Sequence, residues 1–302
     1  MMPQVFILIL CLFPIGLNAQ QLVDKHYQVK NTQDYFPNSN RPRVKIDAAH
    51  ANFHTLEGKY QPFAKVLSNA GFQVSSNLKS IDRDLLKSTD ILVIANALHP
   101  QNRRNWDLPN YPAFKRSEIE ALFNWVKAGG SLMLIADHMP FPKAAEELAE
   151  IFGFHFSNSY VEILGSREQY FEISDNSLQS HAILTGMQGS QSISKVRGFM
   201  GQAFLSPPQA KPIMSFSKAA VAYMPKKSWG INDDTPTIPV QGWHQGASLE
   251  LGKGRLLVFG EAGMFTAQVS GKEQWKMGLA AKGAEQNEQF LINSLLWLAR
   301  KI

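Results

Sequence analysis

Ser117–His138 reads SEIEALFNWVKAGGSLMLIADH, and this stretch decides the fold class. Ser117 and Glu120 have the spacing of a capping box, which opens a helix. Apolar residues then recur three and four positions apart, as on one face of a helix, until two glycines end the pattern. Leu132–Ala136 (LMLIA) follows as an uninterrupted apolar run, which is typical of a strand buried on both faces. The stretch therefore predicts an amphipathic helix that leads into a buried parallel strand.

The same alternation of strand and helix patterns extends upstream and returns near the C-terminus, where Glu285–Arg300 has the pattern of a last helix. Strands that are apolar on both faces and alternate with amphipathic helices imply a parallel sheet that is covered on both sides. Right-handed crossovers then give an α/β fold with a flavodoxin-like, doubly wound sheet of spatial order 2-1-3-4-5. In chain order, the five strands are predicted at Val44–Ala49, Phe72–Ser75, Ile91–Ala95, Leu132–Ala136 and Leu256–Gly260.

The pattern changes between about residues 157 and 251. Helical periodicity disappears there, and short strand-like pieces are separated by Gly, Pro, Ser and Asn. We interpret this segment as a β-rich insertion in one α/β domain that spans residues 43–302. Residues 20–42 are polar and contain two prolines, so we expect an extended lead-in to that domain.

The first residues have the character of a secretory signal peptide. Val5–Leu17 is apolar and uncharged, but it is too short to span a bilayer, which takes about 20 residues in a helix. A small residue, Ala19, follows at a plausible cleavage point. Leu10 stands where a lipoprotein signal needs a small residue before Cys11, so no lipid anchor is expected. We therefore expect residues 1–19 to be removed and the protein to be periplasmic or secreted.

Cysteine content and charge exclude several classes of function. Cys11 is the only cysteine and lies inside the leader, so the mature chain would have no disulfide, no cysteine nucleophile and no thiolate metal site. The formal net charge is +5, with the basic residues scattered along the chain. Nucleic-acid-binding proteins normally have a basic cluster or stripe, so we do not expect this protein to bind nucleic acid. No later stretch is long and apolar enough to span a membrane.

Polar side chains gather where the predicted strands end. Ligands of open α/β sheets bind just past the carboxyl ends of the strands. We expect Asp137, His138 and Glu261 to be catalytic, because they follow the fourth and fifth strands and can exchange protons. Residues expected to bind the substrate at the same edge are Asn52, Asn96, His99 and Gln268.

His50 and His54 are candidate metal ligands. Their spacing, His-x-x-x-His after the first strand, is compatible with two imidazoles on one metal ion. Asp137 or Glu261 would supply a carboxylate, and His138 a third imidazole. A divalent metal is thus the one cofactor that the sequence suggests. Histidines that are hydrogen-bonded within the protein or to a substrate are the alternative interpretation.

Several of these pieces resemble the DUF4350 proteins, a family within the class I glutamine amidotransferase-like superfamily. The matching segments are DAAHANFHTLEGKYQPFA, DILVIANAL, WVKAGGSLMLIADHMPFP, GEAGMFTAQ and AEQNEQFLINSLLWL. They cover most of Arg43–Asn158 and of Gly254–Leu298, whereas the middle region matches less clearly. The resemblance implies an amidotransferase-like, flavodoxin-like core, but it brings no established reaction.

The resemblance to this superfamily also shows which activity is not expected. In true amidotransferases a cysteine occupies the sharp turn after the strand equivalent to Leu132–Ala136. Here that turn reads Ile135-Ala136-Asp137-His138, with neither Cys nor Ser. Glutaminase chemistry through a covalent thioester is therefore not expected.

Two functions remain open from the sequence. The first is an exported hydrolase of unknown substrate, in which the histidines and carboxylates bind a metal or act as general acid and base. The second is a non-catalytic domain that binds a saccharide, another small molecule or a cell-envelope partner. Its stacking face would come from Trp106, Trp229 or Trp243. The sequence lacks a complete catalytic motif, which favours binding, while titratable groups at one sheet edge favour catalysis.

Overall fold

A nine-stranded sheet forms the centre of the molecule. The computed structural model describes residues 21–37, 40–271 and 275–302. Five neighbouring strands of the sheet are parallel, in the order β3-β2-β4-β5-β15. The predicted α/β class with a mostly parallel sheet is confirmed. The five strands are β2 (Arg43–Asp47), β3 (Gln73–Asn77), β4 (Ile91–Ala95), β5 (Ser131–Ile135) and β15 (Gly254–Phe259).

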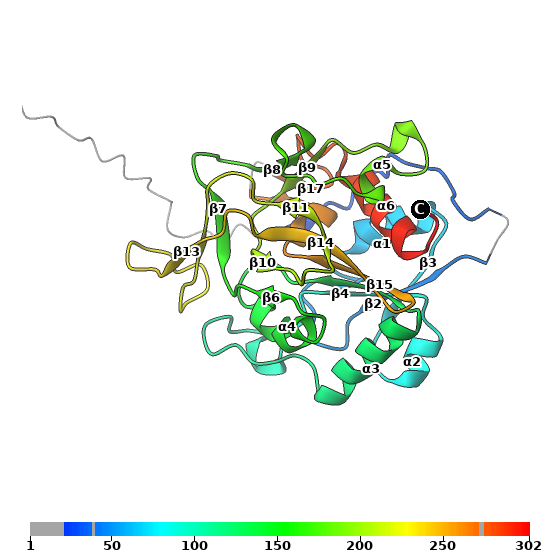
Figure 1. Cartoon of the computed structure of the whole chain (residues 1–302), viewed down its shortest axis with the longest axis horizontal. Helices are drawn as coiled ribbons and strands as arrows, with labels where there is room; N and C mark the ends of the chain where they lie inside the picture. The colour runs from blue at the N-terminus through cyan, green and yellow to red at the C-terminus, as the bar shows by residue number, and fades with distance from the viewer. Residues whose placement is uncertain (1–20, 38–39, 272–274) are drawn as a thin grey trace, which may run out of the picture.

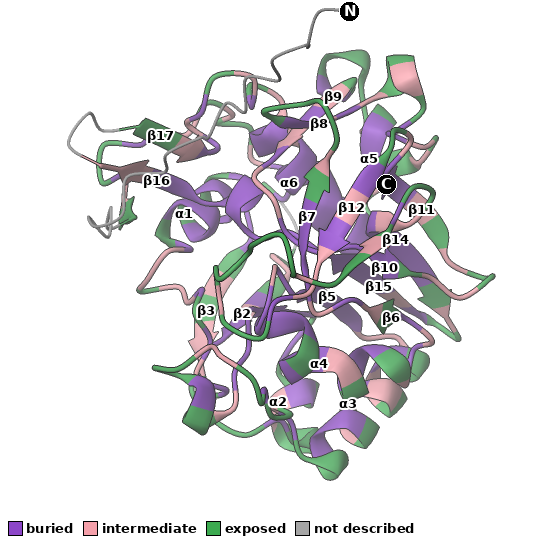
Figure 2. Ribbon diagram, turned by 90° about the vertical axis from the view of Figure 1, so that its left-hand side faces the viewer, coloured by how far each residue is buried: buried purple, intermediate pink, exposed green. Residues whose placement is uncertain are grey.

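Helices cover both faces of the parallel strands, as Figure 2 shows. Along β4, β5 and β15 successive side chains enter two different cores, because side chains alternate across a strand. Met133 and Leu257 pack towards α1 and α6, while Leu132 and Leu256 pack towards α3 and α4. The helices are α1 (Gln61–Asn69), α2 (Arg83–Lys87), α3 (Arg116–Ala128), α4 (Phe141–Glu150), α5 (Ala182–Thr185) and α6 (Asn287–Leu298).

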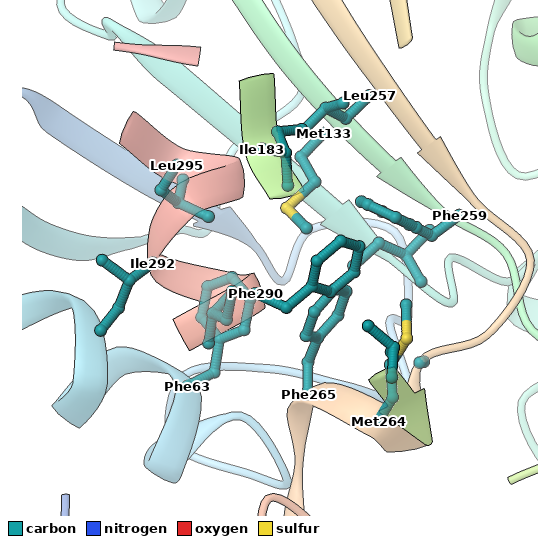
Figure 3. Packing of buried hydrophobic residues seen from close by; sticks show 14 of the residues in the cluster. Phe63, Met133, Ile183, Leu257, Phe259, Met264, Phe265, Phe290, Ile292 and Leu295 are labelled. Carbon is teal, nitrogen blue, oxygen red and sulfur yellow. The ribbon is translucent and has the colours of Figure 1, made fainter. Parts of the chain in front are cut away.

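Aromatic side chains fill the core between the sheet and α6 (Figure 3). Phe265 and Phe290 stack with ring centroids 6.1 Å apart, and Phe259 meets both rings edge to face. All three side chains are fully buried. Burial of a phenylalanine contributes roughly 1.5–3 kcal/mol. This packing fixes the end of β15 and the 3₁₀ turn Gly263–Phe265 that follows it.

The middle of the chain is rich in strands, but it is not separate from the main sheet. β14 (His244–Leu251) pairs antiparallel with β15, and β10, β11 and β6 extend the sheet beyond it. The predicted insertion therefore enlarges the sheet instead of only sitting on it, because β14 offers β15 a ladder partner as long as itself. The remaining strands in these groups are β6 (His155–Phe156), β10 (Phe204–Leu205) and β11 (Lys211–Ser215).

Three smaller sheets surround this framework. One is formed by β7, β12 and β13, and its hairpin β12–β13 protrudes at the left of Figure 1. The others pair β8 with β9, and β16 with β1 and β17. Their bounds are β1 (Leu22–Val23), β7 (Tyr160–Ile163), β8 (Gln169–Glu172), β9 (Lys195–Gly198), β12 (Ala220–Tyr223), β13 (Thr237–Pro239), β16 (Ala267–Ser270) and β17 (Trp275–Gly278).

The start of α3 differs from the prediction. The helix begins at Arg116, and its N-cap residue is Lys115. The backbone N–H of Lys115 donates to the carboxylate of Glu118 at 3.0 Å. The predicted Ser117–Glu120 capping box is therefore wrong. Glu118 is also bonded to His50 and to the backbone of Ile81. Glu120 instead pairs with Arg116 on the exposed face of the helix.

The predicted signal peptide, residues 1–19, lies outside the described residues. Within the ranges that the structure does describe, none of the helices has the length and apolar character that crossing a bilayer requires.

Candidate functional site

The carboxyl ends of β2, β4, β5 and β15 meet at one edge of the sheet, because these strands are parallel neighbours or next neighbours. Directly after them come His50, Asn96, Asp137 and Glu261. Each of these side chains is buried. The topology therefore brings residues from four separated segments to one place, as the sequence predicted for the edge as a whole.

Asn96 joins three of these segments. Its amide Nδ2 donates to His54 Nδ1 at 3.0 Å, and its Oδ1 accepts from the backbone N–H of Asp137 at 2.9 Å. Its own backbone oxygen accepts from Phe53 N at 2.9 Å. The residue has a positive φ of 50°, a conformation that asparagine tolerates better than most residues. Both polar side-chain atoms of Asn96 are thus bonded to neighbouring segments, which gives it a positioning role in this structure where a substrate ligand was predicted.

His54 is held as a neutral ring. Burial lowers its pKa well below 6.5, and the charges of Lys59 and His138 act in the same direction. Because Nδ1 accepts from Asn96, Nε2 carries the proton. Tyr60 packs on the ring with centroids 4.9 Å apart. His54 can therefore donate a hydrogen bond at this edge without carrying charge.

Asp137 is not consumed by capping the helix that follows it. Helix α4 begins at Phe141, and its N-cap residue, Pro140, makes no side-chain cap. One carboxylate oxygen of Asp137 accepts from His138 N at 2.7 Å, and the other accepts from Ala262 N at 3.3 Å. Each oxygen keeps a further lone pair. Asp137 is only 7% exposed, so it is largely shielded from bulk solvent.

Glu261 lies behind Asp137 and is fully buried. Burial raises its pKa well above the ordinary value, and the negative charge of Asp137 raises it further. Backbone N–H groups of Gly263 and Met264 donate to its two oxygens, at 2.6 and 2.7 Å, and partly oppose this effect. Glu261 is therefore held near Asp137 in its protonated form at higher pH than usual, while it also ties down the turn after β15.

His138 is half-exposed at the same edge of the sheet. Its ring Nδ1 donates to the backbone oxygen of Met139 at 2.7 Å. In the neutral ring this leaves Nε2 unprotonated, with a lone pair free to accept a proton. Tyr160 stacks on the imidazole with centroids 4.7 Å apart and an interplanar angle of 17°, and Trp229 meets it at 4.7 Å.

Trp229 belongs to the flap, which we define as residues 224–236 between β12 and β13. The hydroxyl of Ser228 shares a 2.8 Å hydrogen bond with Tyr160 Oη. The backbone N–H of Ser228 donates to Asp107 Oδ1, also at 2.8 Å. Leu108 N donates to Lys226 O at 3.0 Å. Trp229 itself has a positive φ of 62° and is 55% exposed. The flap thus covers His138 with an indole ring held by contacts from distant segments.

His50 belongs to a different network at the same edge. Its Nδ1 lies 2.7 Å from Asp47 Oδ2, and its Nε2 lies 3.1 Å from Glu118 Oε1. Glu118 also accepts from Ile81 N at 2.9 Å. Burial by itself lowers the pKa of His50, but its bonds and charge interactions with Asp47 and Glu118 outweigh this and raise it above 6.5. Both ring nitrogens are occupied, so His50 ties β2 to the start of α3.

The predicted metal pair does not form, because His50 and His54 bond to different partners. His50 is saturated by carboxylates, and Nδ1 of His54 is bonded to Asn96. In the part of the chain that the structure describes, no three His, Cys, Asp or Glu side chains are grouped so that they could hold a metal ion. A metal shared by His50 and His54 is therefore not part of the proposed chemistry.

The other predicted substrate ligands have local roles. Asn52 accepts from His50 N at 3.0 Å and donates to Ala95 O at 3.3 Å. His99 accepts from Gln101 N at 3.2 Å and caps a short 3₁₀ turn. Gln268 is buried in β16, where its Nε2 donates to Thr266 Oγ1 at 2.8 Å. Hydrogen bonds to backbone atoms account for Asn52 and His99. Among the described residues, Gln268 makes no hydrogen bond to His138.

Two residues next to the site were missed by the sequence reasoning. Lys59 lies with its Nζ 4.3 Å from the centre of the Phe53 ring. Burial lowers the pKa of Lys59, and the charge of Asp137 opposes that effect. Tyr60 is buried, with its pKa raised by burial and by the charges of Glu261 and Asp137. Both belong to the long loop after β2, and the sequence signal that points to them is their position soon after His54 in that loop.

Comparisons with known proteins support the fold only. No protein-family model matches this chain, and no curated protein matches it. The mmIFT52 N-terminal domain is similar in structure, with a TM-score of 0.58 and 14% identity, over 85% of this chain and 97% of that domain. A ThuA-like protein from Bacteroides uniformis has a TM-score of 0.47 and 12% identity, over 90% of this chain and 95% of that protein. The protein STM1381 from Salmonella typhimurium LT2 has a TM-score of 0.49 and 11% identity, over 85% of this chain and 99% of that protein.

Proposed function

We propose that this chain is a hydrolase in which His138 acts as the general base that activates a water molecule. One observation carries the proposal: the Nδ1–H of His138 is bound to the oxygen of Met139 at 2.7 Å, which leaves Nε2 as the basic nitrogen at a half-exposed position. Imidazole is the side chain whose pKa suits proton transfer near neutral pH.

The surrounding groups fit that role. In the proposed reaction, Nε2 of His138 takes a proton from water as the water oxygen bonds to the substrate. The bond from the attacked atom to the leaving group then breaks, and the imidazolium gives this proton to the leaving group, which takes the electron pair. Asp137, whose carboxylate accepts the backbone N–H of His138 at 2.7 Å, stabilises the transient imidazolium. Lys59 and the Nε2–H of His54 are the groups that would stabilise negative charge developing on the substrate.

We further propose that the chain is an exported protein of the DUF4350 type within the glutamine amidotransferase-like superfamily. The quoted sequence segments support this, together with a strand order that corresponds to 2-1-3-4-5 in the flavodoxin-like scheme. The leader sequence supports a periplasmic or secreted location. The turn after β5 carries Asp137 in place of a nucleophilic cysteine, so the proposed chemistry uses water directly.

A second function, binding of a saccharide without catalysis, is favoured by one observation. Phe53 is 38% exposed and Trp229 is 55% exposed, and Trp106 lies 5.0 Å from Phe53. Exposed aromatic faces beside hydrogen-bonding groups suit the ring faces of sugars.

Hydrolysis of chromogenic substrates separates the two functions. The mature protein would be tested on p-nitrophenyl esters and p-nitrophenyl glycosides, alongside the variant His138→Gln. Turnover that His138→Gln abolishes supports the hydrolase. No turnover on any substrate, together with saccharide binding that His138→Gln leaves unchanged, would replace it with the binding function.

A further inference from the structure

A cavity lies at the opposite, amino edge of the sheet. It has a volume of about 1160 Å³ and is lined by the starts of β2, β3, β4 and β5, by α2 and α3, and by the turn after α6. In Figure 1 the C-terminus, β3 and α2 lie on the right, whereas the β12–β13 hairpin that carries the flap protrudes on the left. This cavity is therefore separate from the site around His138.

The cavity is strongly basic. Asp90 is the one carboxylate among its lining residues, and it pairs with Arg43 at 2.9 Å. Arg83 has no carboxylate within ion-pair distance among the described residues. The cationic lining residues are Arg41, Arg43, Arg83, Lys87 and Arg300. Arg41 pairs with Asp34, and Lys87 pairs with Asp84 at 3.2 Å, so Arg83 and Arg300 are the lining cations that no described carboxylate offsets. Their two positive charges attract anions to the opening.

Arg300 is fixed in place and has no acidic partner among the residues that the structure describes. It has a positive φ of 58°, and its guanidinium donates to Ser131 Oγ at 3.3 Å, to Gly129 O at 3.1 Å and to Lys253 O. These acceptors are neutral, so the bonds orient the guanidinium but do not cancel its charge. An arginine that is oriented before a ligand binds loses less entropy on binding.

Trp125 gives the cavity a flat apolar wall. Its ring lies so close to the backbone of Gly130 that a Cβ atom there would come within 2.2 Å of the indole. The missing side chain thus lets the ring lie directly against the chain turn before β5. An indole beside guanidinium groups suits a ligand that carries both anionic groups and a ring.

We propose that this cavity binds a molecule with phosphate or sulfate groups. Tetrahedral oxyanions match the two parallel N–H groups of an arginine fork, which Arg83 offers, since no bond of its guanidinium to a described residue is seen. Arg300, whose terminal nitrogens are bonded to neutral oxygens, adds its charge to the attraction. The ring of the ligand would lie on Trp125. The site is independent of the proposed hydrolysis, because it shares no residue with the carboxyl edge.

Titration calorimetry at low salt tests the proposal, with pyrophosphate, ATP and a heparin disaccharide as probes. We expect binding of at least one probe, weakened five-fold or more by Arg83→Gln and further by Arg83→Gln with Lys87→Gln, and weakened by added salt. Tighter binding of ATP would identify a phosphate ligand, and tighter binding of the disaccharide a sulfated one.

The matched control is Arg167→Gln, an exposed arginine on the loop between β7 and β8. It removes the same charge away from the cavity and should leave affinity unchanged. Equal weakening by Arg83→Gln and Arg167→Gln, or no binding of any probe, would overturn the proposal. His138→Gln should bind the probes as the unmodified protein does, so the outcome is independent of the proposed hydrolase.

Discussion

His50 and His138 follow neighbouring parts of the same sheet edge, yet their surroundings differ. His50 has both ring nitrogens bonded to buried carboxylates, Asp47 and Glu118. His138 has one nitrogen bonded to a backbone oxygen and no hydrogen-bond partner on the other among the described residues, and its ring packs against Tyr160 and Trp229. A histidine whose nitrogens are both occupied stabilises the fold, whereas one with a free nitrogen can take part in chemistry.

The comparison predicts that substitution of His138 mainly lowers activity, whereas substitution of His50 mainly lowers stability. His138→Gln should lower turnover on any substrate found by about 100-fold or more, because general base catalysis contributes about 10²–10⁴-fold. Its unfolding free energy should fall by about 1–2 kcal/mol, because one bond to a backbone oxygen and the stacking of the ring on Tyr160 are lost. Initial rates and urea unfolding measure the two effects.

A large loss of stability in His138→Gln, with turnover retained in the folded fraction, would contradict this assignment. Asp137→Asn provides a second check. It keeps the size of the side chain and removes its charge, so we expect a smaller loss of turnover than in His138→Gln.

For His50 the expected effect is on stability. His50→Leu leaves Asp47 and Glu118 buried without their shared partner, which should lower the unfolding free energy by about 3 kcal/mol. His50→Gln should cost less, because its amide can still donate to one carboxylate. Urea unfolding gives both values, and His99→Gln, at a half-exposed position, is the control with a change within about 0.5 kcal/mol. If His99→Gln costs as much as His50→Leu, the ion-pair network is not what stabilises this edge.

The pH dependence sharpens the same contrast. The pKa of His50 is raised above 6.5, so its contribution is complete below that pH and is lost as pH rises through the folded-state value. Burial raises the pKa of Glu118, but backbone N–H bonds and His50 outweigh it, and the net pKa lies below 4.5. The contribution of Glu118 is therefore present above pH 4.5 and is lost as pH falls through the depressed value.

The stability difference between the unmodified protein and His50→Leu should consequently be largest between about pH 4.5 and 6.5. Urea unfolding of both proteins at about pH 5.5 and 8.5 measures it. A difference that grows towards pH 8.5 would show that His50 is not bound as an imidazolium.

The smallest expected effect concerns the flap. Trp229→Gly removes the ring over His138 and relieves the positive φ, a strain of order 1–3 kcal/mol, so stability should be kept or slightly raised. Diethyl pyrocarbonate should then modify His138 several-fold faster, as measured by peptide mass spectrometry. Ile231→Ala, on the same flap, is the control that should leave the rate unchanged. Unchanged reactivity in Trp229→Gly would mean that the flap does not shield His138.

The sequence carried the local and periodic part of the structure. Apolar runs such as Ile91–Ala95 and the amphipathic stripe of α3 predict buried strands and helices, because both patterns arise from residues close in the chain. The same patterns placed Asp137, His138 and Glu261 at the carboxyl edge, since a residue that follows a parallel strand must lie there. The absence of Cys and Ser from the turn after β5 was likewise readable from the sequence.

Only the tertiary structure decided which of these polar groups are free. His50 meets Glu118, 68 positions away, and Trp229 covers His138 from 91 positions away. β14 joins the main sheet through ladder bonds to β15 that no hydrophobic pattern specified. Such pairings depend on how whole elements pack and on which hydrogen bonds remain to be satisfied when they do. Residue type and strand position therefore determined where chemistry could occur, and long-range contacts determined which histidine is available for it.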